Sequence, residues 1–173
     1  MAPAGDAFCC GWLHYPGSGR VDESARRLSH EEYAVARLLA GEGHDVRSLP
    51  ESRRGGRRPD LLVCGTTVEV KSFAPVAERR RMPTPQSVFN KLMDAGGQAS
   101  HVVLVAGGSG LSAVTARRGL ARYAADRRER PVLASVRVVG DGYDLAWSRP
   151  AGVEVGRPVR IAPARRPERG LGL

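Results

Sequence analysis

The apolar run HVVLVA at residues 101–106 constrains the fold more than any other feature of the sequence. A strand that is apolar without alternation is buried on both faces, which is typical of a parallel sheet covered by helices. Two further runs, at 60–64 and 67–72, hold aliphatic and β-branched residues and flank Gly65-Thr66, so they predict a β-hairpin. Because strand-like runs then alternate with helix-like segments, we expect an α/β protein with a mixed sheet flanked by helices.

The helical segments carry start and stop signals. A capping box begins at Ser29, and Gly41 marks the end of the helix that follows it. Thr84-Pro85 supplies a cap and a first-turn proline for a second helix, which we expect to run to about Ala99. The remaining expected elements are a strand at 45–49, a basic helix at about 112–129, a strand at 131–140 and, after the turn Asp141-Gly142, a strand at 143–147. The expected order is therefore α-β-β-β-α-β-α-β-β.

The length of 173 residues fits one domain with tails. We expect an N-terminal appendage over 1–28, a folded domain over 29–148 and a basic, mostly disordered tail over 149–173. The first residues lack a basic region followed by a long apolar stretch, and no apolar run is long enough to cross a membrane. The sequence therefore predicts no membrane partner and a cytoplasmic site of action.

The chain is strongly basic, with 27 Lys and Arg residues against 18 Asp and Glu, a formal charge of +9 and a pI near 10.4. Such a balance favours a polyanionic partner, above all nucleic acid, although a general preference for arginine with solvated charge would produce it too. Lys71 and Lys91 are the only lysines, which suggests positions that need a compact ammonium rather than a planar guanidinium. The candidate phosphate contacts are Arg53, Arg54, Arg57, Arg58, Arg79, Arg80, Arg81 and Lys91.

The three cysteines are too few, and odd in number, for a disulfide framework, and they fit a reducing compartment. Cys9-Cys10 and His14 are not followed by a second pair at zinc spacing, so we interpret them as structural residues rather than a metal site. Cys64 lies in an apolar run and is predicted to be a small core residue.

The hairpin carries the residues with the clearest chemistry. Side chains alternate along a strand, so Glu69 and Lys71 share one face while Val68 and Val70 share the other. Closing the hairpin brings Asp60, at the far end of the paired strand, toward Glu69. Two neighbouring carboxylates repel unless a cation lies between them, and their oxygens suit Mg²⁺, with Mn²⁺ or Zn²⁺ as the other candidates. A metal held there lowers the pKa of a bound water, and Lys71 can orient that water or stabilise charge on a phosphate. The alternative is a surface hairpin with an exposed Glu-Lys face.

Pro59-Asp60 followed by Glu69-Val70-Lys71 resembles the signature of the PD-(D/E)XK nuclease superfamily. The stretches from Glu32 through PDLLVCGTTVEVKS to NKLMDAGGQASHVVLV are similar to the C-terminal nuclease domains of contact-dependent growth inhibition and other polymorphic toxins. The resemblance covers roughly residues 29–140. It implies a restriction-endonuclease-like sheet with an α-β-β-β-α-β core and a metal-dependent endonuclease activity, with RNA, specifically tRNA, slightly favoured over DNA.

The resemblance also implies roles for individual residues. Asp60 and Glu69 would be metal ligands, Lys71 the catalytic lysine, Glu32 an accessory carboxylate and Gln98 a polar residue on the following helix. An acidic immunity protein would be a partner, and the chain would belong to an exported toxin system. A DNA-repair or restriction enzyme and a catalytically inactive nucleic-acid-binding module are the alternative functions.

Two of these positions have competing interpretations. Glu32 is also the expected capping-box partner of Ser29, and Glu31 is a rival for the accessory position because it lies with another apolar stripe of the same helix. Lys91 and Gln98 fall on one face of the predicted second helix, where they could contact a phosphate; the alternative is an exposed Lys91 and a Gln98 that is hydrogen-bonded to the backbone.

Overall fold

The computed structural model describes residues 18–51, 58–78, 81–126 and 133–149. Its elements, in chain order, are β1 (Val21–Asp22), α1 (His30–Gly41), β2 (Val46–Ser48), β3 (Leu61–Val63), β4 (Thr66–Ser72), the 3₁₀ turn η1 (Val76–Glu78), α2 (Pro85–Ala95), β5 (His101–Val105), α3 (Ala113–Ala125), β6 (Ser135–Gly140) and β7 (Tyr143–Ser148). The predicted order of helices and strands is confirmed from α1 onward.

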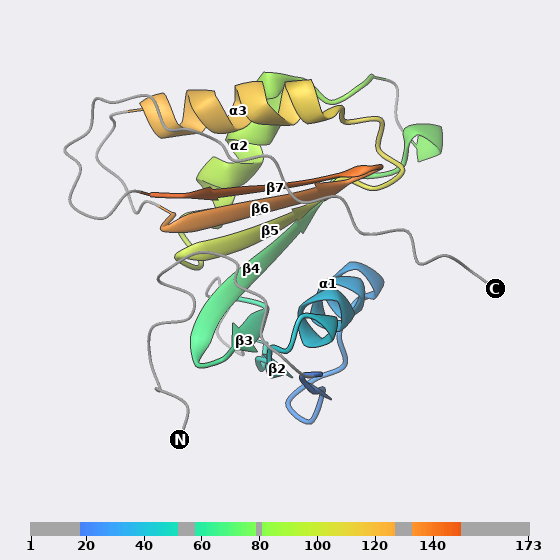
Figure 1. Cartoon of the computed structure of the whole chain (residues 1–173), viewed down its shortest axis with the longest axis vertical. Helices are drawn as coiled ribbons and strands as arrows, with labels where there is room; N and C mark the ends of the chain where they lie inside the picture. Colours follow the sequence, from blue (N-terminus) through green and yellow to red (C-terminus); the bar gives the residue numbers. More distant parts are fainter. Residues whose placement is uncertain (1–17, 52–57, 79–80, 127–132, 150–173) are drawn as a thin grey trace.

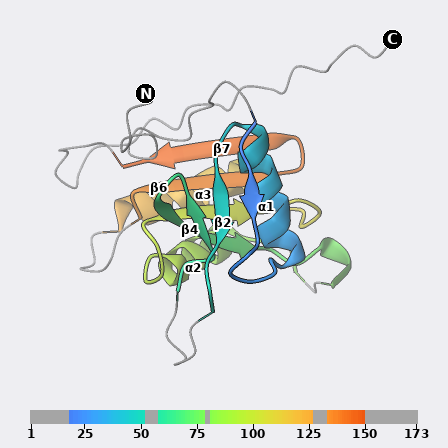
Figure 2. The ribbon, with the colours of Figure 1, turned by 90° about the horizontal axis from the view of Figure 1, so that it is seen from below.

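The strands of the described residues form one seven-stranded mixed sheet in the order β1-β2-β3-β4-β5-β6-β7. The pairs β1–β2, β4–β5 and β5–β6 are parallel, and the pairs β2–β3, β3–β4 and β6–β7 are antiparallel. Helix α1 covers one face, while α2 and α3 cover the other (Figure 1). The predicted α/β class with a mixed sheet flanked by helices is therefore confirmed. The sheet is strongly twisted, because β1 and β2 run across the direction of β6 and β7 (Figure 2).

Strand β4 joins the two halves of the sheet. Its residues from Thr66 to Val68 pair with β3, and its residues from Val68 to Ser72 pair with β5. Because β3 has only three residues, the second half of β4 has no ladder partner on the β3 side. The backbone N–H and C=O groups that face the β3 side along this half of β4 need other hydrogen-bond partners. A side chain can therefore bind to the edge of β4 here.

Two apolar clusters hold the helices to the sheet. The cluster under α1 contains Leu28, Val35, Ala36, Leu39, Val46, Leu61, Val63, Val68 and Val103. The cluster under α2 and α3 is built around Val88, Leu92, Val102, Leu104, Ala116, Leu120, Tyr123, Leu133, Val136, Val138, Leu145 and Trp147. The prediction for the valines of β4 is confirmed: Val68 is buried under α1 and Val70 packs against the same cluster.

The helix starts agree with the sequence analysis, and one helix end does not. Ser29 caps α1 and Thr84 caps α2, each in a capping box. The expected end of the second helix at Ala99 is wrong, because α2 ends at Ala95 and the two glycines that follow form a turn. A glycine pair costs too much helical stability for Gln98 and Ala99, which are only half-buried, to continue the helix.

The hairpin and the N-terminal segment also differ from expectation. The turn lies at Cys64-Gly65, one residue before the predicted Gly65-Thr66, and both of its residues have positive φ angles of 48° and 86°. Cys64 is exposed in this turn, so its predicted core position is wrong. The strand β1 was not predicted: Val21–Asp22 pair with β2, so the folded domain starts before residue 29. Cys9, Cys10 and His14 lie outside the described residues.

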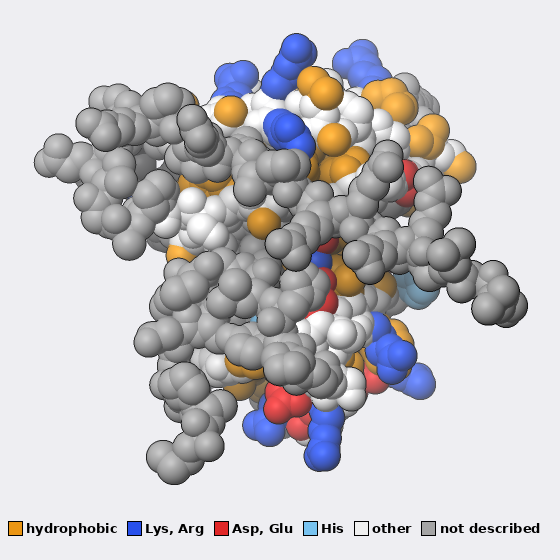
Figure 3. Space-filling view, in the orientation of Figure 1, with side chains coloured by type: hydrophobic (Ala, Val, Ile, Leu, Met, Phe, Trp, Pro, Cys, Tyr) orange, Lys and Arg blue, Asp and Glu red, His pale blue; other side chains and the backbone are white. Residues whose placement is uncertain are grey.

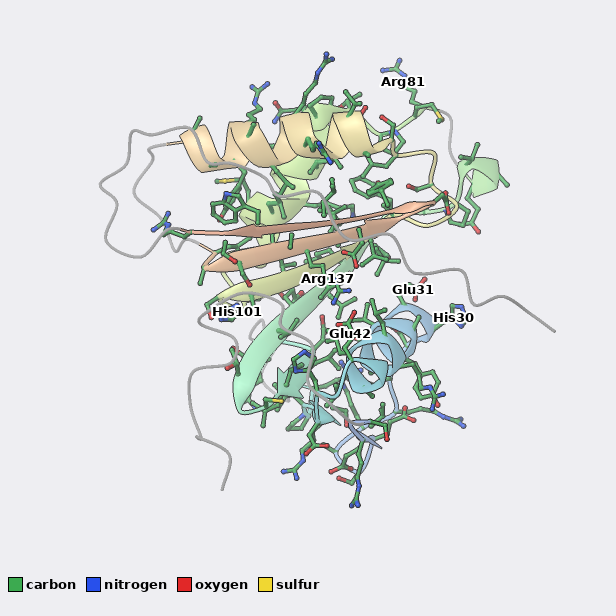
Figure 4. All side chains as sticks on the ribbon, viewed as in Figure 1. His30, Glu31, Glu42, Arg81, His101 and Arg137 are labelled. Carbon is green, nitrogen blue, oxygen red and sulfur yellow. The ribbon has the colours of Figure 1, made fainter. Side chains whose placement is uncertain are left out.

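A buried ion network joins the C-terminal end of α1 to strands β6 and β7. Arg137 on β6 is 4% exposed and donates to Glu42, the C-cap of α1, at 2.5 Å, and to Asp144 on β7 at 2.6 Å. Figure 4 shows Arg137 and Glu42 pointing toward each other between the sheet and the end of α1. Burial opposes the charged state of Arg137, but the two carboxylates outweigh it and raise the pKa of the guanidinium.

The described helices include none long and apolar enough to cross a membrane.

Candidate active site

The missing ladder partner of β4 is replaced by a carboxylate. The backbone N–H of Val70 donates to Asp60 Oδ2 at 2.8 Å, from a position where β3 no longer pairs with β4. In the observed register Leu61 lies opposite Val68, so Asp60, one residue earlier, lies beside Glu69. The earlier turn at Cys64-Gly65 produces this alignment, because a turn at Gly65-Thr66 would have shifted the register by two residues.

Glu69 and Lys71 lie on the same face of β4, as predicted from strand alternation. They pair in register with Val102 and Leu104, whose side chains belong to the core under α2 and α3. The side chain of Glu69 is 3% exposed, and its Oε1 accepts a hydrogen bond from Lys71 Nζ. The side chain of Lys71 is 24% exposed and so links the buried carboxylate to solvent. Glu69 Oε2 is buried and accepts no hydrogen bond from the described part of the chain.

A third carboxylate joins this pair from α1. Glu32 Oε2 accepts from the backbone N–H of Ser29 at 2.7 Å and from Arg26 Nη1 at 2.7 Å, while Glu32 Oε1 accepts from Arg26 Nη2 at 2.8 Å. Arg26 Nη2 also lies 3.5 Å from Asp60 Oδ1, so the guanidinium bridges the two carboxylates. Asp60 also lies close enough to Glu69 and Glu32 for their charges to raise the pKa of its carboxyl group. Asp60, Glu69, Glu32 and Lys71, four of the predicted site residues, are thus together.

The surroundings of Glu32 favour its charged form. Burial by itself would raise the pKa of this carboxyl, but hydrogen bonds from Arg26 and from the Ser29 N–H lower the pKa to about 2. The same contact raises the pKa of the Arg26 guanidinium. Glu32 and Arg26 therefore form an ion pair at neutral pH.

Asp60 and Glu69 are in the opposite situation. Burial, opposed by the hydrogen bond from Val70 and reinforced by the negative charge of Glu69, raises the pKa of Asp60 to about 7. Burial also raises the pKa of Glu69, although Lys71 acts against this. A buried and a half-buried carboxylate with raised pKa values are short of positive charge, and a divalent cation beside them would reverse both shifts.

These residues fit a divalent metal ion in part. Over the described ranges, no group of three or more His, Cys, Asp or Glu side chains could hold a metal as it stands. Asp60 and Glu69 nevertheless offer two carboxylates side by side, one with an oxygen that lacks a partner. Mg²⁺ is commonly held by one or two carboxylates and keeps several waters, so this donor set suits it better than Zn²⁺, which prefers nitrogen and sulfur ligands.

The other predicted site residues are placed elsewhere. Gln98 follows the end of α2, and its side chain donates back to the carbonyl of Asp94 at 3.2 Å, so its predicted position on a helix face is wrong. Lys91 Nζ lies over the ring of Phe73, 5.1 Å from the centroid, where the chain leaves β4. Glu31, the rival of Glu32, is exposed at the outer start of α1 (Figure 4).

Two of the predicted phosphate-binding arginines can be placed. Arg58 is exposed and lines a cavity of about 180 Å³ together with Arg26 and Asp60. Arg81 is exposed on the side of the sheet that carries α2 and α3 (Figure 4), where further basic side chains gather on the outer surface (Figure 3). Arg53, Arg54, Arg57, Arg79 and Arg80 lie outside the described residues.

The sequence analysis missed Arg26. The nearest signal was the segment DESARR just before the α1 cap, which contains this arginine but has no spacing that ties it to the hairpin. A chain reversal before Ser29 brings Arg26 back over the start of α1, and only the fold brings Glu32 and Asp60 within reach of the same guanidinium.

The chain matches no family model, no curated protein and no solved structure. The interpretation of the site therefore depends on its own residues and on their geometry.

Proposed function

We propose that this protein is a metal-dependent endonuclease that hydrolyses phosphodiester bonds and has a site of PD-(D/E)XK type. The observation that carries the proposal is Glu69, a buried carboxylate with one unpartnered oxygen, beside Asp60 and in contact with Lys71. A purely structural strand gains little from burying such a group, because a buried polar oxygen without a hydrogen-bond partner is costly. Buried titratable groups with shifted pKa values and a defined charge partner are typical of catalytic sites.

The order of the elements supports a restriction-endonuclease-like core. From α1 to β5 the chain follows α-β-β-β-α-β, and the carboxylates come from α1, from the residue just before β3 and from the middle of β4. These are the positions that the resemblance of Pro59-Asp60 and Glu69-Val70-Lys71 implies.

Each side chain of the cluster has a task in the proposed reaction. Asp60 and Glu69 would hold a divalent ion, Mg²⁺ by preference, which when bound polarises a phosphoryl oxygen and lowers the pKa of a coordinated water. Glu69 fixes the Lys71 ammonium through Oε1, and Lys71 in turn donates to the attacking water or to a non-bridging phosphate oxygen. Val70 fixes the Asp60 carboxylate through its backbone N–H.

The substrate is nucleic acid on grounds of charge. The formal charge of +9 attracts a polyanion, and the exposed Arg58 can approach a phosphate backbone from the cavity beside Asp60, which Arg26 and Glu51 also line. Contacts of this kind bind without sequence choice and weaken as salt rises. The resemblance favours RNA, specifically tRNA, over DNA, and the toxin setting that it implies would add an acidic immunity protein as partner.

Paired digestions test this proposal. Purified protein is incubated with total tRNA and with plasmid DNA, each with Mg²⁺ and with Mg²⁺ plus EDTA, and the products are separated by electrophoresis. We expect cleavage of tRNA with Mg²⁺, none with EDTA and none by the Asp60→Asn variant. The control is Arg47→Met, which removes an exposed ion pair with Asp22 remote from the cluster.

The alternatives give different patterns. Duplex DNA cut while tRNA stays intact would indicate an enzyme of repair or restriction type. Salt-sensitive binding without cleavage of either substrate would refute the proposal in favour of an inactive binding module.

A further inference from the structure

Arg26 is held in the carboxylate cluster from several sides. Its Nε donates to the carbonyl of Leu49 at 2.9 Å, and its Nη1 donates to the carbonyl of Arg27 at 3.2 Å. Its two Nη atoms face the two oxygens of Glu32, and Nη2 reaches Asp60 Oδ1. The side chain is 17% exposed. A bidentate guanidinium fixed in this way is pre-organised and does not exchange freely with solvent.

Both carboxylate oxygens of Glu32 are engaged by other groups, so they are not available as ligands for a metal ion. Both oxygens of Glu32 are directed at the guanidinium, and Oε2 also caps α1 through the Ser29 N–H. Asp60 keeps one oxygen on the Val70 N–H, while its other oxygen lies 3.5 Å from Arg26. Glu69 Oε2 remains as the buried oxygen that accepts no hydrogen bond from any described residue.

The net charge of the cluster also favours a single metal ion. Three carboxylates face two fixed cations, Arg26 and Lys71, so one net negative charge remains when every group is ionised. A single divalent ion changes the net charge of the ionised cluster from −1 to +1, whereas a second would raise it to +3 in a half-buried site. Two-metal phosphodiesterase sites instead place both ions among carboxylates a few ångströms apart.

We propose that Arg26 is a positioning residue that stands where a second metal ion would bind, so that the site takes one divalent ion, held by Asp60 and Glu69. This inference rests on the proposed function, because it assigns the number of ions to that same site. Arg26 keeps Glu32 as a structural partner and leaves Lys71 as the remaining cation next to the bound ion.

Counting the bound ions tests the inference without measuring activity. Mn²⁺ is titrated into the metal-free protein, and free Mn²⁺ is followed by electron paramagnetic resonance to give the number of ions per chain. We expect one ion for the parent protein, two for Arg26→Met, in which Glu32 is released as a ligand, and one again for Arg26→Met combined with Glu32→Gln. The matched control, Arg47→Met, should bind one ion, because it breaks an arginine–carboxylate pair away from the cluster.

The outcomes are separable. Two ions in the parent protein, or one ion in a folded Arg26→Met variant, would overturn the role of Arg26 and leave the proposed metal-dependent function standing. No bound ion in the parent would refute the proposed function, and the inference with it. If circular dichroism shows that Arg26→Met is unfolded, Glu32→Gln decides: retention of one ion supports the inference, and its loss overturns it.

Discussion

The raised pKa of Asp60 predicts that the metal-free protein loses stability between pH 5 and pH 8. Asp60 has a pKa of about 7 in the fold against 3.8 for the free group, so between these values the folded state binds a proton that the unfolded state does not. Stability from this group is fully present below pH 3.8 and is lost as the pH rises through about 7.

The magnitude follows from linkage. Each tenfold difference in proton affinity corresponds to about 1.4 kcal/mol, so Asp60 alone lowers the free energy of unfolding by up to about 3 kcal/mol between pH 5 and pH 8. His101 has the opposite effect on stability. Burial lowers the pKa of its imidazole, so the folded state gains stability from this group as the pH rises. Glu32, with a pKa of about 2, stays charged throughout this range and does not contribute.

Comparison with Asp60→Asn isolates the effect. Both proteins are unfolded with urea in EDTA at several pH values. The free energy of unfolding of the variant, relative to that of the parent, should increase as the pH rises, by up to about 3 kcal/mol between pH 5 and pH 8. The amide oxygen can still accept from Val70, so the strand contact is kept. Asp22→Asn is the matched control, because Asp22 is more exposed and its pKa is lowered, so the slope between pH 5 and pH 8 should not change. A constant difference between parent and Asp60→Asn over this range would refute the reasoning.

Two further predictions concern stability away from the cluster. Arg137→Met leaves Glu42 and Asp144 without their shared buried partner, so we expect a loss of about 3–5 kcal/mol in urea unfolding, against less than about 1 kcal/mol for Arg47→Met at its exposed pair; equal losses in the two variants would contradict this. Cys64→Asn should stabilise the protein by up to about 1 kcal/mol, because Cys64 has a φ of 48° before a glycine and asparagine tolerates that conformation better; a lower melting temperature would contradict it.

The sequence predicted those parts of the fold that depend on local patterns. The apolar run at 101–106 identified the central parallel strand β5, and the capping boxes at Ser29 and Thr84 located the starts of two helices. These signals are local because a buried strand needs apolar residues on both faces and a helix start needs a side chain to satisfy its free N–H groups.

The features that the sequence did not predict depend on long-range contacts. The two-residue strand β1 has no periodicity to detect, and it exists because β2 offers it an edge. The turn at Cys64-Gly65 requires a positive φ at a cysteine, which local preference disfavours and strand pairing enforces.

The same distinction separates the predicted from the missed parts of the site. Glu69 and Lys71 could be placed on one face from strand alternation alone, and a hairpin brings Asp60 to the same end of the strand pair. The position of Asp60 opposite Glu69 depends on the turn at Cys64-Gly65, which was not predicted. Arg26 could not be placed, because its contacts to Glu32 and Asp60 depend on how the chain turns before α1.

The most direct test of the central claim is the cleavage rate of Glu69→Gln, measured together with its stability. The buried oxygen of Glu69 that lacks a partner has no structural benefit, so the isosteric amide should leave the melting temperature of the metal-free protein unchanged or higher. We expect this folded variant to cleave tRNA with Mg²⁺ at least about 100-fold more slowly than the parent, because one of the two metal ligands is lost. A folded Glu69→Gln variant that cuts as fast as the parent would contradict the account.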